Sequence, residues 1–221
     1  NRTERAALAA AAFERFGGPP PAPRFAQDWF AGLDAAVLYT VLRDRRPCRV
    51  VEIGSGHSTR VTARAVADGS LATEVIAVDP APRARLAGLA VTWHRRPIQA
   101  MDPALVAALA PGDVLFVDSS HVLVDGSDVA VLFTALLPRL RSGVLLHVHD
   151  VFLPDPYPEA WAWRGYNEQQ AVAGLLLGGF ELVFASAFVR RHAPDLLGPV
   201  ARSLVVPPGA YEKIGRASCR E

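Results

Sequence analysis

The sequence has very little lysine and cysteine, and it has no long apolar run. Lys213 is the single lysine among 221 residues, which argues against a phosphate-binding P-loop, a Schiff base or a pyridoxal phosphate anchor. Cys48 and Cys219 are the only cysteines, and they give no disulfide framework or zinc pattern. No apolar run approaches the roughly 20 residues that cross a bilayer, and no signal-peptide pattern is visible. We therefore expect a cytoplasmic protein with no membrane partner.

The charges are nearly balanced. There are 23 basic and 22 acidic residues, a formal net charge of +1, so the chain has no electrostatic footprint for nucleic acid. Half of the residues are apolar and a fifth are charged, a composition typical of one soluble domain with a substantial core. A small-molecule ligand is the expected partner. A homodimer is compatible with this composition but is not specified by it.

The pattern divides the chain into three parts. Residues 1–47 are expected to form two helices, 1–16 and about 27–45, joined by the proline-rich segment 17–23, and to cover the pocket of the core. Residues 48–213 form that core. Residues 214–221 (IGRASCRE) follow no hydrophobic pattern and resemble the translation of a sequencing adapter. We expect them to be a non-native tail, with a genuine polar tail as the alternative.

Apolar runs alternate with helical patterns throughout the core. The predicted strands are residues 49–53, 74–79, 90–94, 113–118, 143–149, 180–185 and 201–206. The predicted helices are residues 58–67, 82–87, 103–109, 127–140 and 167–177. Continuous apolar strands separated by helices indicate an α/β fold, in which a mostly parallel sheet has helices on both faces.

A glycine turn follows the first predicted strand, in the stretch CRVVEIGSGHSTR (residues 48–60). Glu52 ends the apolar run, and Gly54 and Gly56 let the backbone turn sharply beside a ligand. A nicotinamide-binding fingerprint has the same first two glycines, but here Thr59 stands where that motif has a small residue. That fingerprint also usually has an apolar residue at the position of Glu52.

Polar residues follow the other strands at the edge where ligands bind in open α/β sheets. Asp79 ends the second strand, where a carboxylate can accept both hydroxyls of a ribose; a cap before Pro80 is the alternative. Two further strand ends each carry an aspartate and a histidine: Asp118 with His121, and His149 with Asp150. Desolvating an aspartate is costly unless it is paired or liganded, so these four residues are candidates for chemistry. His147, further from the strand end, is expected to be a core histidine.

The ordered set of motifs resembles class I S-adenosylmethionine (SAM) dependent methyltransferases, and specifically bacterial O-methyltransferases that act on small molecules. The motif Glu-x-Gly-x-Gly-x-Ser, the block LFVDSSH, the block PRLRSGVLLHVHDVF and the helix start YNEQ carry the resemblance, which covers about residues 48–184. It implies a Rossmann-like, seven-stranded sheet whose last strand is antiparallel. It also implies SAM as cofactor, bound by residues of the turn and of the strand ends: Glu52, Gly54, Ser55, Gly56, Ser58, Asp79, Gln99 and Asp118.

In related catechol-type enzymes, a divalent metal is held by an aspartate after strand four and an Asp-Asn pair after strand five. Asp118 and Asp150 match the two aspartates, but Val151 stands in place of the asparagine. Two aspartates with waters could hold Mg²⁺. Because the asparagine is missing and two histidines are present, we favour a metal-free site over a metal site. In it, His149 or His121 is the general base and Asp118 orients it.

The expected activity is therefore methylation of a small-molecule oxygen by SAM. The alternatives are a nicotinamide-dependent oxidoreductase and a methyltransferase-like domain that binds SAM without catalysis. The aromatic loop 152–163 is expected to wall the acceptor pocket through Trp161 and Trp163. Asn167 is expected to form a capping box with Gln170 at the start of its helix.

Overall fold

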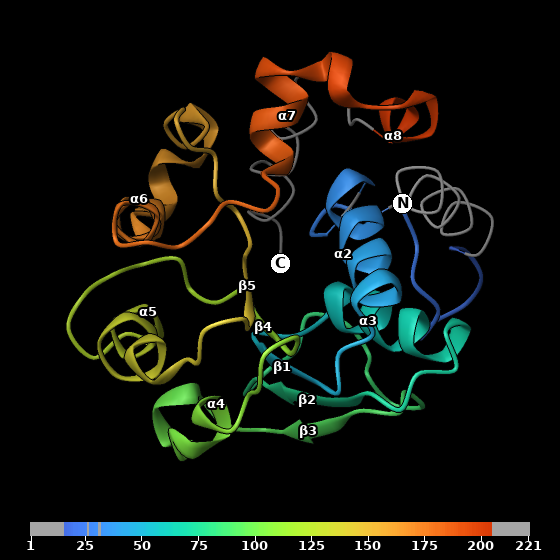
Figure 1. The fold of residues 1–221 in the computed structure, drawn as a ribbon, viewed down its shortest axis with the longest axis horizontal. Coiled ribbons are helices and arrows are strands. Elements are labelled where there is room, and N and C mark those ends of the chain that lie inside the picture. The colour runs from blue at the N-terminus through green and yellow to red at the C-terminus, as the bar shows by residue number, and fades with distance from the viewer. Residues whose placement is uncertain (1–15, 26, 31, 205–221) are drawn as a thin grey trace.

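A computed structural model describes residues 16–25, 27–30 and 32–204. Among these residues, five strands form one parallel sheet in the order β3-β2-β1-β4-β5 (Figure 1). The strands are β1 (Arg49–Ile53), β2 (Glu74–Val78), β3 (Thr92–His94), β4 (Val114–Val117) and β5 (Leu145–Val148). The strand order reverses between β1 and β4, and ligands bind outside the carboxyl ends of the strands at such a switch point.

The register of the sheet brings the strand ends to one level. Ile53 of β1 pairs with Val78 of β2 and with Val117 of β4, and Val117 pairs with Val148 of β5. The next residues continue the ladder by one bond each: the Gly54 amide donates to Val78 (3.0 Å), and the Asp118 amide donates to Ile53 (2.8 Å). The residues that follow β2, β1, β4 and β5 therefore lie side by side.

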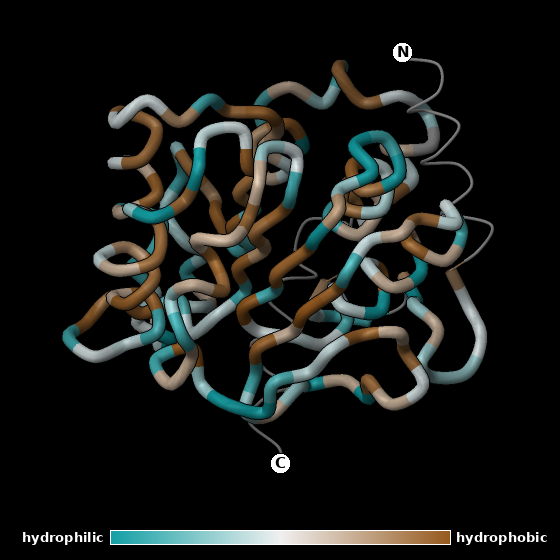
Figure 2. Tube along the Cα trace, turned by 60° about the horizontal axis from the view of Figure 1, so that its bottom comes forward, coloured by the Kyte–Doolittle hydropathy of each residue, from teal (hydrophilic) through white to brown (hydrophobic). Residues whose placement is uncertain are grey.

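Helices cover both faces of the sheet (Figure 1). Because side chains alternate along a strand, Val50 and Phe116 pack against α2 (Gly32–Arg45) and α3 (His57–Asp68). Val51 and Val117 pack on the other face against helices of the segment 98–140. These are η1 (Ile98–Ala100), α4 (Ala104–Ala107), α5 (Asp128–Val131), η2 (Leu132–Leu136) and η3 (Leu137–Arg139). The hydrophobic tube segments accordingly run through the interior in Figure 2.

Between β5 and residue 204, the regular elements are all helices. They are η4 (Glu159–Arg164), α6 (Glu168–Leu177), α7 (Ser186–His192), η5 (Pro194–Leu196) and α8 (Pro199–Ser203). No helix in the described ranges is both long and apolar enough to span a membrane.

Five of the seven predicted strands are present, and the sixth and seventh are not found in the described part of the chain. Residues 180–185 adopt no strand, and Leu182 within them is 64% exposed. Residues 201–203 belong to α8, whose first residue is Pro199; a proline at that position favours a helix start. Residues 205–206 lie outside the described ranges. The antiparallel last strand is therefore not shown.

Two predicted helices also differ from the structure. Residues 82–87 form an irregular segment with no helix, and the carbonyl of Arg85 accepts hydrogen bonds from the Arg60 guanidinium (3.1 and 3.0 Å). The helix expected from about residue 27 begins at Gly32, because Gln27 Oε1 accepts the amides of Trp29 (2.8 Å) and Phe30 (2.9 Å) in a turn of its own. The helix expected over residues 1–16 lies almost wholly outside the described residues.

Candidate functional site

Gly54 makes the close approach between the β1 turn and the end of β4. Its φ is +80°, a backbone conformation that favours glycine. A Cβ at this position would lie 1.8 Å from the backbone oxygen of Asp118. A side chain at residue 54 would therefore strike the protein backbone.

Asp79 braces the same turn from β2. Its Oδ2 accepts from the backbone amide of Ser55 (2.6 Å) and from the Ser55 hydroxyl (3.1 Å), while Oδ1 accepts the Ala81 amide (2.7 Å). The cap before Pro80 is thus present as a tight turn without a following helix. A carboxylate offers about four lone-pair sites, so these three bonds leave one site, on Oδ1, for a ribose hydroxyl, and a second hydroxyl would have to replace that of Ser55.

Glu52 is a buried acid beneath the turn. It is 1% exposed, and its Oε1 accepts the hydroxyl of Ser58 on α3. Its Oε2 is buried without a hydrogen-bond partner in the described part of the chain. Burial raises the pKa of Glu52 to about 8. At that pKa the acid is mostly protonated at pH 7 in the absence of a ligand, and a cationic group of a ligand beside Oε2 would favour its ionised form.

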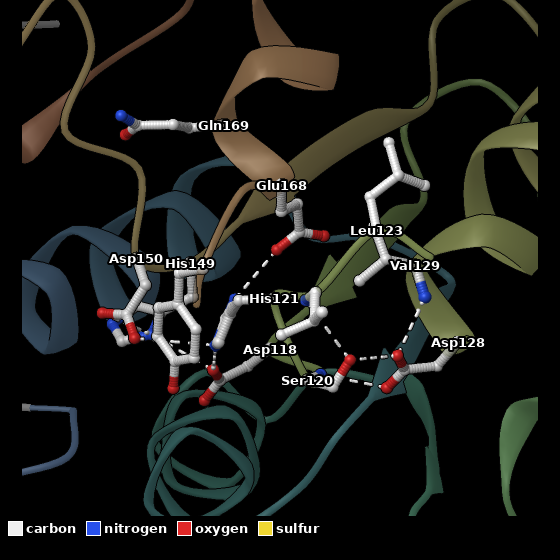
Figure 3. A network of polar contacts seen from close by, with 12 residues as sticks. Asp118, Ser120, His121, Leu123, Asp128, Val129, His149, Asp150, Glu168 and Gln169 are labelled. Atoms are coloured by element: carbon white, nitrogen blue, oxygen red, sulfur yellow. Dashed lines mark hydrogen bonds and ion pairs between the residues drawn. The ribbon is translucent and has the colours of Figure 1, made fainter. Parts of the chain in front are cut away.

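The four polar residues after β4 and β5 meet in one cluster, as the strand ends predicted (Figure 3). His121 Nε2 lies 3.2 Å from Asp118 Oδ1 and 3.5 Å from Asp150 Oδ2. His149 Nδ1 lies 3.3 Å from the same Asp118 oxygen and 3.5 Å from Asp150 Oδ1. Two imidazoles therefore face two carboxylates at the edge of the sheet.

The backbone is strained at two members of this cluster. His121 has a φ of +60° and Asp150 a φ of +55°, values that residues other than glycine rarely adopt. Such strain persists only where the surroundings impose it, and it concentrates at functional sites.

Burial and charge act in opposite directions on these groups. Burial lowers the pKa of each imidazole, but the carboxylates outweigh it, and the pKa rises to about 9 for His121 and to about 10 for His149. The two imidazoles in turn hold the pKa of Asp118 well below its usual range, against the effect of burial. Burial raises the pKa of Asp150. At pH 7 both imidazoles of the cluster are therefore mostly protonated.

The same cluster could hold a cation. One ligand atom from each of Asp118, His149 and Asp150 lies within 4.8 Å of the others. Carboxylate and imidazole ligands suit several divalent ions. Val151 offers no side-chain oxygen, so His149 would be the third ligand of a bound ion, in place of the asparagine of the catechol-type arrangement.

Glu168 is the buried acid that the sequence analysis missed. It begins α6, is 0% exposed, and its Oε2 lies 2.8 Å from Nδ1 of His121 (Figure 3). Its neighbour Asn167 does not form the predicted capping box: Asn167 Oδ1 accepts the Leu123 amide instead. The only sequence signal for Glu168 was its place in the YNEQ helix start.

Two other predicted residues lie apart from the cluster. Gln99, on η1 after β3, is exposed and donates to the Gly126 carbonyl (3.1 Å). His147 stacks on Phe116 with ring centroids 4.3 Å apart, and burial lowers its pKa to about 4. His147 is therefore packed on Phe116, but it is half-buried and lines the large cleft, so it is not the fully buried core histidine that was expected.

The two tryptophans of the aromatic loop are not equivalent. Trp161 is 4% exposed and packs edge-on against Phe152 (5.4 Å between centroids) and Tyr166 (6.0 Å). Trp163 is 63% exposed. Trp161 is thus a packing residue of the loop, whereas Trp163 projects from it.

Two cavities adjoin the cluster. A small one of about 30 Å³ lies among Trp29, Arg83, the β1 turn and the Asp118–His149–Asp150 group, and the Arg83 guanidinium covers the Trp29 ring at 4.1 Å. A large open cleft of about 1310 Å³ extends from His149 and Asp150 along β5. Its lining comes from α2, β5, the aromatic loop and residues 178–188.

Comparison with known families gives one match. The family model of the methyltransferase domain matches residues 51–151, which span β1 to β5 and every sequence-predicted site residue. No curated protein matches the chain. Residues 51–151 are therefore similar to a methyltransferase domain, which supports the class I SAM-dependent methyltransferase family.

Proposed function

We propose that this protein transfers a methyl group from SAM to an oxygen atom of a small molecule. The observation that carries the proposal is the meeting, at one sheet edge, of a glycine turn over a buried carboxylate with a cluster of two histidines and two aspartates. The first element suits a cationic cofactor, and the second suits an acceptor that must lose a proton. A nicotinamide cofactor has no need of an unpartnered Glu52 oxygen below the turn.

The residues around the turn fit SAM. Glu52 Oε2 would bind the ammonium group, and Ser55, Gly56 and Ser58 would surround the amino-acid end at the start of α3. Asp79 would accept the ribose hydroxyls, Gln99 would contact the adenine, and Asp118 would close the site beside Gly54. When bound, SAM supplies a methyl group activated by its sulfonium.

The chain's own residues would position and deprotonate the acceptor. The mainly apolar cleft along β5 would hold the acceptor, so that the enzyme's main task is alignment of two reactants. His149 would accept the hydroxyl proton, with His121 beside it and Asp118 orienting both rings. Because the pKa of His149 is about 10, the fraction of His149 able to accept a proton grows as the pH rises, and methylation should accelerate from pH 7 towards pH 10.

Calorimetry with separate ligands tests the cofactor. We expect SAM and S-adenosylhomocysteine to bind and NAD to give no heat. An acceptor screen of phenols and aliphatic alcohols with methyl-labelled SAM then tests turnover. Binding of NAD without SAM would contradict the proposal, and SAM binding with no turnover across the screen would favour a binding domain without catalysis.

Removal of metal by EDTA distinguishes the two ways of activating the acceptor, by a histidine base or by a bound divalent ion. With His149 as a metal-free base, activity survives EDTA and is lost in His149→Ala. If EDTA removes activity and Mg²⁺ or Mn²⁺ restores it, Asp118, Asp150 and His149 act as ligands, and the metal-free mechanism is wrong. His192→Ala is the matched control, because His192 pairs with Asp155 outside the cluster.

A further inference from the structure

His121 is held by acids at both ring nitrogens. Glu168 Oε2 lies 2.8 Å from Nδ1, while Nε2 faces Asp118 Oδ1 at 3.2 Å and Asp150 Oδ2 at 3.5 Å (Figure 3). The Tyr166 ring lies against the imidazole with centroids 4.7 Å apart. The ring therefore has one orientation in which all its polar atoms are matched.

The start of α6 also holds the main chain of His121. The amides of Asn167 (3.0 Å) and Glu168 (3.2 Å) both donate to the His121 carbonyl. Asn167 further clamps Leu123 through its side-chain oxygen (2.6 Å) and nitrogen (3.2 Å). These bonds, which need no carboxylate, already dock α6 on the loop after β4.

The carboxylate of Glu168 is thus unnecessary for docking and costly to bury. It is 0% exposed, and its Oε1 has no hydrogen-bond partner among the described residues. An apolar side chain at this position would avoid that desolvation. Among the described residues, the contact that a carboxylate makes and an apolar side chain could not is the one with Nδ1 of His121.

We propose that Glu168 is a positioning residue that fixes the His121 ring, so that Nε2 faces Asp118, Asp150 and the acceptor. Such a partner on the far nitrogen sets the orientation and basicity of an imidazole whose other nitrogen works in a site. The proposal rests on the proposed function and adds a residue outside the matched segment 51–151.

A spectroscopic comparison tests the contact itself. In ¹⁵N-labelled protein, the His121 Nδ1 proton should give a strongly deshielded signal, which Glu168→Gln shifts and Glu168→Leu abolishes. Asn167→Ala is the matched control: it weakens the same docking without touching the ring, so it should lower thermal stability and keep the signal. A signal unchanged in both Glu168 variants would overturn the proposal.

A double-mutant cycle tests the function. With the best acceptor from the screen, Glu168→Gln should lower kcat by about 10- to 100-fold while the affinity for S-adenosylhomocysteine stays within about twofold. If Glu168 acts through His121, adding Glu168→Gln to His121→Asn costs no further kcat. Losses that multiply would show an independent, structural role and overturn the proposal. If wild type does not bind S-adenosylhomocysteine, the proposed function fails, and the spectroscopic arm still reports on the contact.

Discussion

At the scale of single residues, Gly54 is constrained twice, by its φ of +80° and by the Asp118 carbonyl 1.8 Å from any Cβ. Gly54→Ala should therefore cost more stability than the roughly 1–2 kcal/mol of left-handed strain alone. It should also displace Asp118 and abolish SAM binding. Urea unfolding and calorimetry measure the two effects.

Gly112 provides the control for this substitution. Its φ is +94°, but no atom lies within 4 Å of a Cβ built there. Gly112→Ala should show the strain without the clash and leave SAM binding intact. Equal loss of stability in the two variants would mean that the turn relaxes away from Asp118.

His149 makes the stability of the protein depend on pH. Its pKa rises from an ordinary 6.5 to about 10 on folding, so the folded state holds this proton more tightly. The resulting stabilisation is fully present below pH 6.5 and is lost as the pH rises through 10. The difference in unfolding free energy between wild type and His149→Gln should therefore shrink from pH 7 to pH 10.

His57 shows the opposite behaviour and serves as the comparison. Burial lowers its pKa to about 4, so its contribution changes between pH 4 and 6.5 and is constant above that. The His57→Gln difference should stay flat from pH 7 to pH 10. Parallel profiles for the two variants would contradict the assignment of the alkaline effect to His149.

The site was predictable from the sequence where strand ends define it. Asp118, His121, His149 and Asp150 each follow a mostly apolar run, and parallel strands bring such ends to one edge. Glu168 follows no strand, and it lies 47 positions along the chain from His121, which it contacts only through the tertiary fold. A local sequence pattern gives no signal for such a long-range contact, so the helix start at Asn167 was interpreted as a capping box.

At the scale of elements, the central strands β1, β2 and β4 were predictable because burial on both faces leaves continuous apolar runs, whereas the apolar runs over 180–185 and 201–203 do not form strands. The errors arose where side chains take over backbone hydrogen bonds. Gln27 satisfies the amides of Trp29 and Phe30 and delays α2 to Gly32. The Arg60 guanidinium occupies the Arg85 carbonyl, which a helix over 82–87 would have needed.

The aromatic loop allows a comparison of two tryptophans on one short helix, η4. Trp161→Ala should destabilise the protein by about 3–5 kcal/mol, because it removes a buried ring. Trp163→Ala should change stability by no more than about 0.5 kcal/mol. Thermal or urea unfolding gives both values. If Trp161→Ala instead unfolds at the same urea concentration as wild type and loses turnover, then Trp161 serves the acceptor pocket and not the packing of the loop.

At the scale of the whole molecule, the proposed cofactor site joins elements from across the fold. The β1 turn, Asp79 after β2, Asp118 after β4 and the start of α3 all contribute, so opening any of them would release the ligand. A ligand that binds only the folded state stabilises it by about 2.7 kcal/mol at a concentration 100 times its Kd. S-Adenosylhomocysteine at that excess should therefore raise the melting temperature of the whole domain in one transition, whereas NAD should not.

The cavity beside Trp29 and Arg83 is only about 30 Å³, about the volume of one water molecule. Binding of the cofactor must therefore also separate the Trp29 ring from the Arg83 guanidinium. Trp29→Phe should then remove a change in tryptophan fluorescence that accompanies the rise in melting temperature. A melting shift with no fluorescence change in wild type would place the ligand elsewhere on the sheet edge.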